Sequence, residues 1–291
     1  WVRSVTDTLV TADLEVCHPD GTVWARITGW TDRRFRTDAT IFPLLRWPEA
    51  NRIAEAQPGG WFLLHDRWAD PANRELIMRR YLGASERRRY EKESPRGRHR
   101  WLLGRIAVKD ALRQWHWDGG AGPLFPAEFA IENEASGRPV VPGRPERISI
   151  AHTGDVAVAL VGRGAVGIDV EAVEERSPQF AAMACTAAER ALLDGTPVDL
   201  TRFWTAKEAV AKAVGTGLGG KPHRFEVVAR DAGELLVAAL DHGSRWRVET
   251  AVIDGATQYV VGWTAAPAGP HEAGAAAPAT FSPLERTSNG R

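Results

Sequence analysis

The chain has 291 residues, enough for one large or two modest domains, and its hydrophobic and charged fractions of 44% and 25% are ordinary for a globular protein. Because 37 basic residues balance 37 acidic ones, there is no global basic field, which argues against nucleic acid as the main partner. Two cysteines are too few for a disulfide framework, and no apolar run reaches transmembrane length, so we expect a cytoplasmic protein without a membrane partner.

The N-terminal part of the chain has the pattern of a β-hairpin followed by a linker. Residues 13–35 alternate apolar and polar positions around a Pro-Asp-Gly turn at 19–21. Residues 38–72 are rich in Trp and aliphatic side chains, but prolines and glycines interrupt them, which predicts extended connecting segments. We therefore expect residues 1–58 to form an extension that precedes the main domain.

Two helical stretches follow, and their polar faces are strongly basic. Residues 73–92 form the first, with Gly83 interrupting it and Ser85 as the expected cap of its second part, and residues 99–115 form the second. The basic side chains are Arg87, Arg88, Arg89, Lys92, Arg96, Arg98, Arg100 and Arg105. Such a run is usually a solvated face, but Arg also binds phosphates in a bidentate manner, and the pattern alone leaves both interpretations open.

Short strands are expected next. The pattern predicts strands at 128–134 and 148–150, and the second leads through His152 and Thr153 into a buried strand at 156–161. A lone histidine is more often structural. At a strand-to-turn junction beside Thr and Gly, however, His152 is also well placed to donate a hydrogen bond to a phosphate.

A strand at residues 166–171 carries two carboxylates on one face. Asp169 and Glu171 are two residues apart and therefore point the same way, while the apolar side chains between them face the core. Gly167 permits the close approach of another backbone or of a ligand. Neighbouring carboxylates repel each other unless they are solvated or share a cation, and oxygen ligands of this kind suit Mg²⁺.

A helical stretch is expected at residues 179–194, with Thr186 as a cap within it. The strongest helix of the sequence is expected at residues 201–214, and the glycines from Gly215 onward end it. Trp204, Glu208 and Lys212 form one stripe on it, at spacings of four residues. A solvated Glu–Lys pair of this kind contributes only about 0.2–0.5 kcal/mol, and this remains the simplest interpretation of the helix taken alone. Four strands of an antiparallel sheet are predicted after it, at 225–228, 234–240, 245–252 and 258–263. The Ala-, Pro- and Gly-rich segment 266–291 is expected to be a disordered tail.

In combination, the strand and the helix resemble the signature of the 4′-phosphopantetheinyl transferase superfamily, Sfp type. The matching residues are Val166-Gly167-Ile168-Asp169 and Trp204-Thr205-Ala206-Lys207-Glu208-Ala209-Val210-Ala211-Lys212. The resemblance covers residues 59–265 and includes Arg100-Trp101-Leu102-Leu103-Gly104 and Gly137-Arg138-Pro139. It implies an α+β fold, a pseudo-twofold pair of α+β halves at 59–162 and 163–265, with coenzyme A bound between them and the β-hairpin segment in front.

The resemblance also implies a reaction. A 4′-phosphopantetheine group would pass from coenzyme A to a serine of an acyl carrier protein or domain, with Mg²⁺ present and 3′,5′-ADP released. The implied metal ligands are Asp169, Glu171 and Glu208, and the implied catalytic residues are Glu208, Lys212 and Asp169. The residues implied for coenzyme A are Arg87, Arg88, Arg100, Arg138, His152, Thr153, Lys207 and Lys212. The serine proton would go to Glu208, with Glu171 or a metal-bound water as the alternative.

The N-terminal residues carry a further resemblance. Residues 20–35 resemble the closing strands of a dehydratase domain with the hot-dog fold, and the whole arrangement resembles the C-terminal transferase domain of an enediyne-type iterative polyketide synthase. This implies a carrier domain in the same or a partner chain, and a transferase that is monomeric as an isolated domain. Two other functions stay open from the sequence: a non-catalytic domain that docks carriers or scaffolds the synthase, and a metal-dependent phosphohydrolase.

Overall fold

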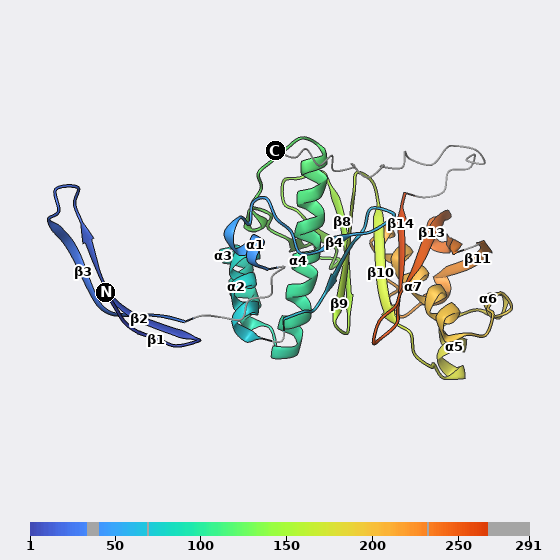
Figure 1. The fold of residues 1–291 in the computed structure, drawn as a ribbon. Coiled ribbons are helices and arrows are strands. Elements are labelled where there is room, and N and C mark those ends of the chain that lie inside the picture. Colours follow the sequence, from blue (N-terminus) through green and yellow to red (C-terminus); the bar gives the residue numbers. More distant parts are fainter. Residues whose placement is uncertain (34–40, 69, 232, 267–291) are drawn as a thin grey trace, which may run out of the picture.

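The fold is α+β, as the sequence predicts, and it is built from antiparallel sheets with helices packed against them (Figure 1). The computed structural model describes residues 1–33, 41–68, 70–231 and 233–266. The tail expected at 266–291 lies outside the described residues from residue 267 onward. Among the described helices, none combines the length and the apolar character needed to cross a membrane.

The N-terminal sheet has three strands, of which the sequence predicts two. β2 (Leu9–Cys17) and β3 (Val23–Arg33) form the expected hairpin, and Gly21 in its turn has a φ of 86°. β1 (Val2–Val5) pairs antiparallel with β2 and was not predicted, because four residues are too short to show an alternating pattern. The order is β1-β2-β3, and Figure 1 shows these strands as a ribbon apart from the other elements.

The first half of the remaining chain packs helices on a four-stranded sheet of order β4-β5-β9-β8. Its helices are α1 (Phe42–Arg46), α2 (Pro71–Tyr81), α3 (Ala84–Lys92) and α4 (Pro95–Asp118). Its strands are β4 (Glu55–Ala56), β5 (Phe62–His65), β6 (Glu132–Asn133), β7 (Pro139–Val140), β8 (Arg147–Thr153) and β9 (Val156–Gly162), of which β6 and β7 pair separately.

Three local predictions for this half are wrong. The segment 38–72 is not merely extended, because it contains α1, with a proline tolerated in its first turn, and β5, a strand of the sheet. Ile41 and Leu44 are fully buried, so the packed unit begins before residue 58. Ser85 does not cap α3, since Gly83 is the N-cap and its backbone N–H donates to the carboxylate of Glu86. The strand expected at 128–134 is reduced to the two residues of β6.

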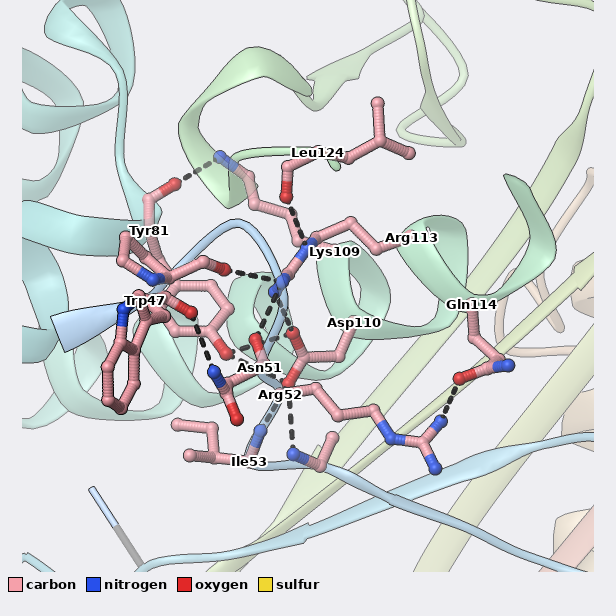
Figure 2. A network of polar contacts seen from close by, with 12 residues as sticks. Trp47, Asn51, Arg52, Ile53, Tyr81, Lys109, Asp110, Arg113, Gln114 and Leu124 are labelled. Carbon is pink, nitrogen blue, oxygen red and sulfur yellow. Dashed lines mark hydrogen bonds and ion pairs between the residues drawn. The ribbon is translucent and has the colours of Figure 1, made fainter. Parts of the chain in front are cut away.

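A buried polar network fixes the linker to α4 (Figure 2). The carboxylate of Asp110 accepts hydrogen bonds from the backbone N–H groups of Ile53 and Ala54 and from the hydroxyl of Tyr81, all at 2.9 Å. Arg113 pairs with the same carboxylate at 2.9 Å, and neither side chain of the pair is exposed to solvent. Because a buried charge is tolerated only when it is paired and hydrogen-bonded, this network ties the linker to the first half.

The second half consists of a five-stranded antiparallel sheet, of order β10-β14-β13-β12-β11, and three helices. The strands are β10 (Val166–Ala172), β11 (Phe225–Asp231), β12 (Glu234–Ala239), β13 (Ser244–Ile253) and β14 (Tyr259–Ala265). The helices are α5 (Pro178–Ala184), α6 (Ala187–Arg190) and α7 (Pro197–Val214).

The expected sheet and the cap at Thr186 are confirmed in this half, with corrections to the helix limits. The helical stretch predicted at 179–194 breaks at Cys185, which separates α5 from α6. α7 begins at Pro197, four residues earlier than predicted, because Thr196 caps it by accepting from the backbone of Asp199. It ends at Gly215, whose φ of 90° suits glycine.

The two sheets face each other, and the helices cover their outer faces (Figure 1). One core lies between α4 and the first sheet, a second between α7 and the second sheet, and a third between the two sheets. Val166, Ile168 and Val170 of β10 all belong to the core between the sheets. Since side chains alternate along a strand, the intervening residues of β10 face α7, and these residues include the predicted carboxylates.

Candidate active site

The site lies where the edge strands of the two sheets meet. β8 is the edge of the first sheet and β10 the edge of the second, and the hydroxyl of Ser149 on β8 accepts a hydrogen bond of 3.0 Å from the backbone of Ile168 on β10. We call this junction the seam. Lys212 of α7 reaches it, with its ammonium 3.1 Å from the carbonyl oxygen of Ile168 and 3.4 Å from that of Ile150.

A glycine allows α7 to approach β10 at the seam. A Cβ on Gly167 would lie 1.8 Å from the carbonyl oxygen of Ala209 and 2.8 Å from the backbone nitrogen of Ala213, so only glycine fits between the strand and the helix. The close backbone approach predicted for this position is therefore present. It brings the face of α7 that carries Glu208 and Lys212 beside the carboxylates of β10.

The structure brings together the three predicted carboxylates and Lys212. Asp169 is 6% exposed, and one of its oxygens accepts from the ammonium of Lys212 at 2.7 Å. Burial raises the pKa of Asp169, and Lys212 opposes that rise. Burial and the charge of Asp169 raise the pKa of Glu171. Burial, with the charges of Asp169 and Glu171 added to it, raises the pKa of Glu208 to about 7. The site therefore concentrates negative charge.

Asp169, Glu171 and Lys212 border a cavity of about 340 Å³ whose opposite wall is basic and aromatic, whereas Glu208 is not among the residues that line it. The polar and aromatic residues that line it are Arg89, Trp101, Arg105, Asn133, His152, Asp169, Glu171 and Lys212. The guanidinium of Arg105 lies 4.7 Å from the centre of the Trp101 ring and donates to the amide oxygen of Asn133 at 3.2 Å. The indole N–H of Trp101 is buried and has no hydrogen-bond partner among the described residues. Such a cavity has donors for an anionic ligand on one wall and acceptors for a cation on the other.

Trp101, Arg105 and Asn133 were not predicted as site residues. In the sequence, Arg105 is one member of the basic helical face, and Trp101 belongs to a stretch that resembles the family. Nothing in the local sequence distinguishes Asn133, which reaches the cavity from β6. The helical period of α4 places residues 101 and 105 on one side, but the sequence does not say that this side faces β10.

Two predicted residues of the first half lie at or near the cavity. His152, near the end of β8, lines it, and withdrawal of its ring from water lowers its pKa, with the charges of Lys212 and Arg100 adding to the effect. Arg138 lies beside it in a connected hollow of about 220 Å³ that Lys212 also lines. The Arg138 guanidinium donates to the carbonyl of Ala213 at 3.0 Å, at the C-terminal end of α7.

Five other predicted ligand-binding residues are not among those that line the cavity in the described part of the chain: Arg87, Arg88, Arg100, Thr153 and Lys207. Arg87 donates to the backbone carbonyls of α2 and its cap, and Arg88 is exposed on α3, so Arg89 is the member of this run that reaches the cavity. Thr153 ends β8 outside the cavity.

Lys207 is the largest correction. Its ammonium is fully buried on the far side of α7 and donates to the carboxylate of Glu189 and to the carbonyl of Ala184, both at 2.7 Å. With every contact on that side of the helix, Lys207 does not reach the cavity. It therefore does not take the phosphate-binding position implied by the resemblance.

The metal-binding capacity of the site is partial. Within the described residues, no group of three or more His, Cys, Asp or Glu side chains is gathered closely enough to hold a metal ion alone. The second carboxylate oxygen of Asp169 is nevertheless buried without a hydrogen-bond partner in the described part of the chain, and it shares the site with two further carboxylates of raised pKa. Such a donor set fits Mg²⁺, which usually takes one or two protein carboxylates and completes its shell with water and substrate phosphates.

Comparisons with known proteins agree with the site. Residues 165–264, which contain β10 and α7, match the family model of the 4′-phosphopantetheinyl transferase superfamily. The chain is also similar to the holo-[acyl-carrier-protein] synthase of Exiguobacterium sibiricum, with 34% identity over 88 residues that cover 29% of this chain and 69% of that protein. With its signature strand and helix assembled at the seam, the chain belongs to the 4′-phosphopantetheinyl transferase superfamily.

Proposed function

We propose that this protein is a phosphopantetheinyl transferase that moves the 4′-phosphopantetheine group of coenzyme A to a serine of an acyl carrier protein. Its family membership and its similarity to a protein named as a holo-[acyl-carrier-protein] synthase support this activity. The single observation that carries the proposal is the convergence of Asp169, Glu171 and Lys212 on one wall of a cavity whose opposite wall is basic, with Glu208 close enough to feel their charges. A bound diphosphate needs a cation to neutralise its oxygens, which the carboxylates can hold, and directed hydrogen-bond donors to orient it, which the basic wall supplies.

We further propose that the reaction depends on Mg²⁺, held by Asp169, Glu171 and Glu208 together with oxygens that the protein does not supply. The partnerless buried oxygen of Asp169 supports this assignment, because such an oxygen is costly unless a donor or a cation meets it. When bound, the ion would neutralise the charge that collects on the diphosphate as the leaving group departs.

The side chains around the cavity then have distinct roles in the proposal. Lys212 contacts the transferred phosphate, and Arg89 and Arg105 on the opposite wall bind anionic groups of coenzyme A together with His152. The serine hydroxyl attacks the β-phosphorus, the bond from that phosphorus to the 3′,5′-ADP oxygen breaks, and the serine proton passes to Glu208, with Glu171 as the alternative acceptor. In such a reaction, positioning and charge neutralisation contribute more than the strength of the base.

The wider setting is also a proposal. The resemblance of residues 20–35 to the end of a dehydratase domain supports a polyketide synthase of the enediyne type, whose carrier domain would be the substrate in the same or a partner chain. We keep the two halves as the working division of the transferase, with the first half extended to include residues 41–58, since Ile41, Leu44 and Ala54 pack in its core. A cytoplasmic location and a monomeric transferase domain complete this setting.

Carrier loading tests the activity directly. The protein is incubated with coenzyme A, Mg²⁺ and the apo carrier domain of the same synthase, and the carrier is weighed by mass spectrometry. We expect one 4′-phosphopantetheine per carrier, no product after chelation with EDTA, and recovery when Mg²⁺ is restored. A carrier that stays in the apo form while it binds the protein would favour a docking or scaffold role. Release of phosphate from nucleotides without any carrier would favour a phosphohydrolase.

A further inference from the structure

A buried ion pair fastens α7 from the side opposite the cavity. Lys207 and Glu189 are both fully buried, and their charged groups lie 2.7 Å apart. Lys207 also donates to the carbonyl of Ala184 at the end of α5. Glu189 also accepts from the backbone N–H of Thr186 at 2.7 Å and from that of Val227 on β11 at 2.8 Å. Lys207 and Glu189 connect α7 to α5, α6 and β11. Because this ion pair lies in the second half of the fold, we call it the second clamp.

The first half contains the same arrangement, which we call the first clamp. Lys109 of α4 pairs with Glu86 and donates to the carbonyl of Tyr81 at 2.6 Å, a contact that Figure 2 shows. Glu86 accepts from the backbone N–H groups of Gly83 and Ile131, each at 3.3 Å. In both halves, therefore, the acidic residue is the third residue of a short helix, accepts from its N-cap and from a later segment, and pairs with the lysine of the long helix.

The residue after each lysine is acidic, but its surroundings differ. Asp110 follows Lys109 and is fully engaged in the network that fixes the linker. Glu208 follows Lys207 and is only half-buried near Asp169 and Glu171, and no hydrogen bond to its carboxylate is found among the described residues. The direction of Glu208 is therefore set by the rotation of α7 about its axis and not by a side-chain partner.

Packing fixes this rotation only in part. Next to Gly167 of β10 and Gly262 of β14, α7 presents the small buried residues Ala206, Ala209 and Ala213, which have no long side chains to interlock with these strands. The large buried side chains of α7, Phe203 and Val210, pack in the core of the second half. An ion pair that is anchored by several hydrogen bonds has one preferred geometry. Successive residues of a helix are about 100° apart, so fixing the direction of Lys207 also fixes that of Glu208 and of Lys212.

We propose that the second clamp is a positioning device for the transfer reaction, in which Glu189 holds α7 in the rotation that directs Glu208 and Lys212 to the seam. The proposal rests on the phosphopantetheinyl transferase activity proposed above. A buried ion pair is often no more stabilising than apolar residues of the same volume, so a role in geometry is the better account of its presence one residue from the site. Glu189 is thus a positioning residue that acts through α7 and touches neither substrate nor metal.

The first clamp supplies a matched control within the same molecule. Glu189→Gln and Glu86→Gln remove the same charge from equivalent arrangements, and both are compared with the wild type for thermal stability, kcat and KM in carrier loading. We expect both variants to melt at similarly lower temperatures. We expect Glu189→Gln to lower kcat by about 10- to 100-fold, since an error of about 1 Å in the placement of reacting groups costs up to about 100-fold. Glu86→Gln should keep kcat within about twofold, although its KM for coenzyme A can change because Glu86 lies 3.9 Å from Arg105.

Amide hydrogen exchange gives a readout that does not depend on activity. Exchange across residues 204–212 should accelerate in Glu189→Gln and remain at the wild-type rate in Glu86→Gln. If Glu189→Gln does not fold, the double variant Lys207→Met with Glu189→Met replaces it, and we expect it to keep its melting temperature while kcat falls. Equal kcat in the two single variants, or a fast kcat in the double variant, would overturn the clamp. A wild-type protein that leaves the carrier unmodified would instead refute the proposed activity, and the exchange rates would still decide whether the clamp fixes α7.

Discussion

The contact between Gly167 and α7 makes a sharp prediction for Gly167→Ala. The new Cβ would lie 1.8 Å from the carbonyl oxygen of Ala209, whereas ordinary van der Waals contact begins near 3.4 Å. The atom it meets belongs to the backbone, so the whole helix must move by about 1.6 Å, as the difference between these two distances requires. Overpacking of this kind costs about 1–3 kcal/mol, which lowers the melting temperature of a domain of this size by roughly 5 °C. The same movement takes Glu208 and Lys212 away from β10.

We therefore expect Gly167→Ala to remain folded and to load the carrier about 100-fold more slowly, because displacement of catalytic groups by about 1 Å has an effect of that order. The assays are thermal unfolding and the initial rate of carrier loading followed by mass spectrometry. Gly164→Ala is the matched control, since a Cβ at Gly164 meets nothing within 4 Å, and we expect it to behave as the wild type. A Gly167→Ala protein with wild-type melting temperature and loading rate would refute the reasoning that this close approach positions the site.

Three further predictions follow from individual contacts. Asp169→Asn keeps the shape of the side chain and removes its charge, so we expect a folded protein whose loading rate falls at least about 100-fold and whose Mg²⁺ binding by calorimetry weakens; unchanged values would exclude Asp169 as a ligand. Asp110→Ala removes one partner of a buried pair and should destabilise the protein by about 3–5 kcal/mol in chemical denaturation, while kcat of the folded protein stays near wild type. Burial raises the pKa of the Cys185 thiol to about 11, so at pH 8, where thiolate is the reactive form, a thiol reagent should modify only the exposed Cys17 in the native protein and both cysteines after unfolding.

Several elements could be predicted because their signals are local. The Pro-Asp-Gly turn, the cap at Thr186 and the end of α7 at Gly215 depend on the backbone preferences of one or two residues. The side-chain alternation of β10 likewise follows from the period of a strand, which is why Asp169 and Glu171 were expected on one face. Segments without a period of their own, such as α1, were missed because their structure depends on burial against the first half.

The sequence by itself determined the family signature and the local placement of its charged residues, with two carboxylates on one face of a strand and Glu208 and Lys212 in one stripe of a helix. Tertiary structure decided which other charged side chains join them. Lys207 and Lys212 are both lysines of the same helix, and the sequence does not distinguish their surroundings. Only the packing of α6 and β11 against α7 shows that Lys207 is buried with Glu189, while Lys212 reaches the seam. Arg87, Arg88 and Arg89 are equally indistinguishable along the chain. A helix turns by about 100° per residue, so the face that meets the cavity is set by how α3 docks, which no local pattern records.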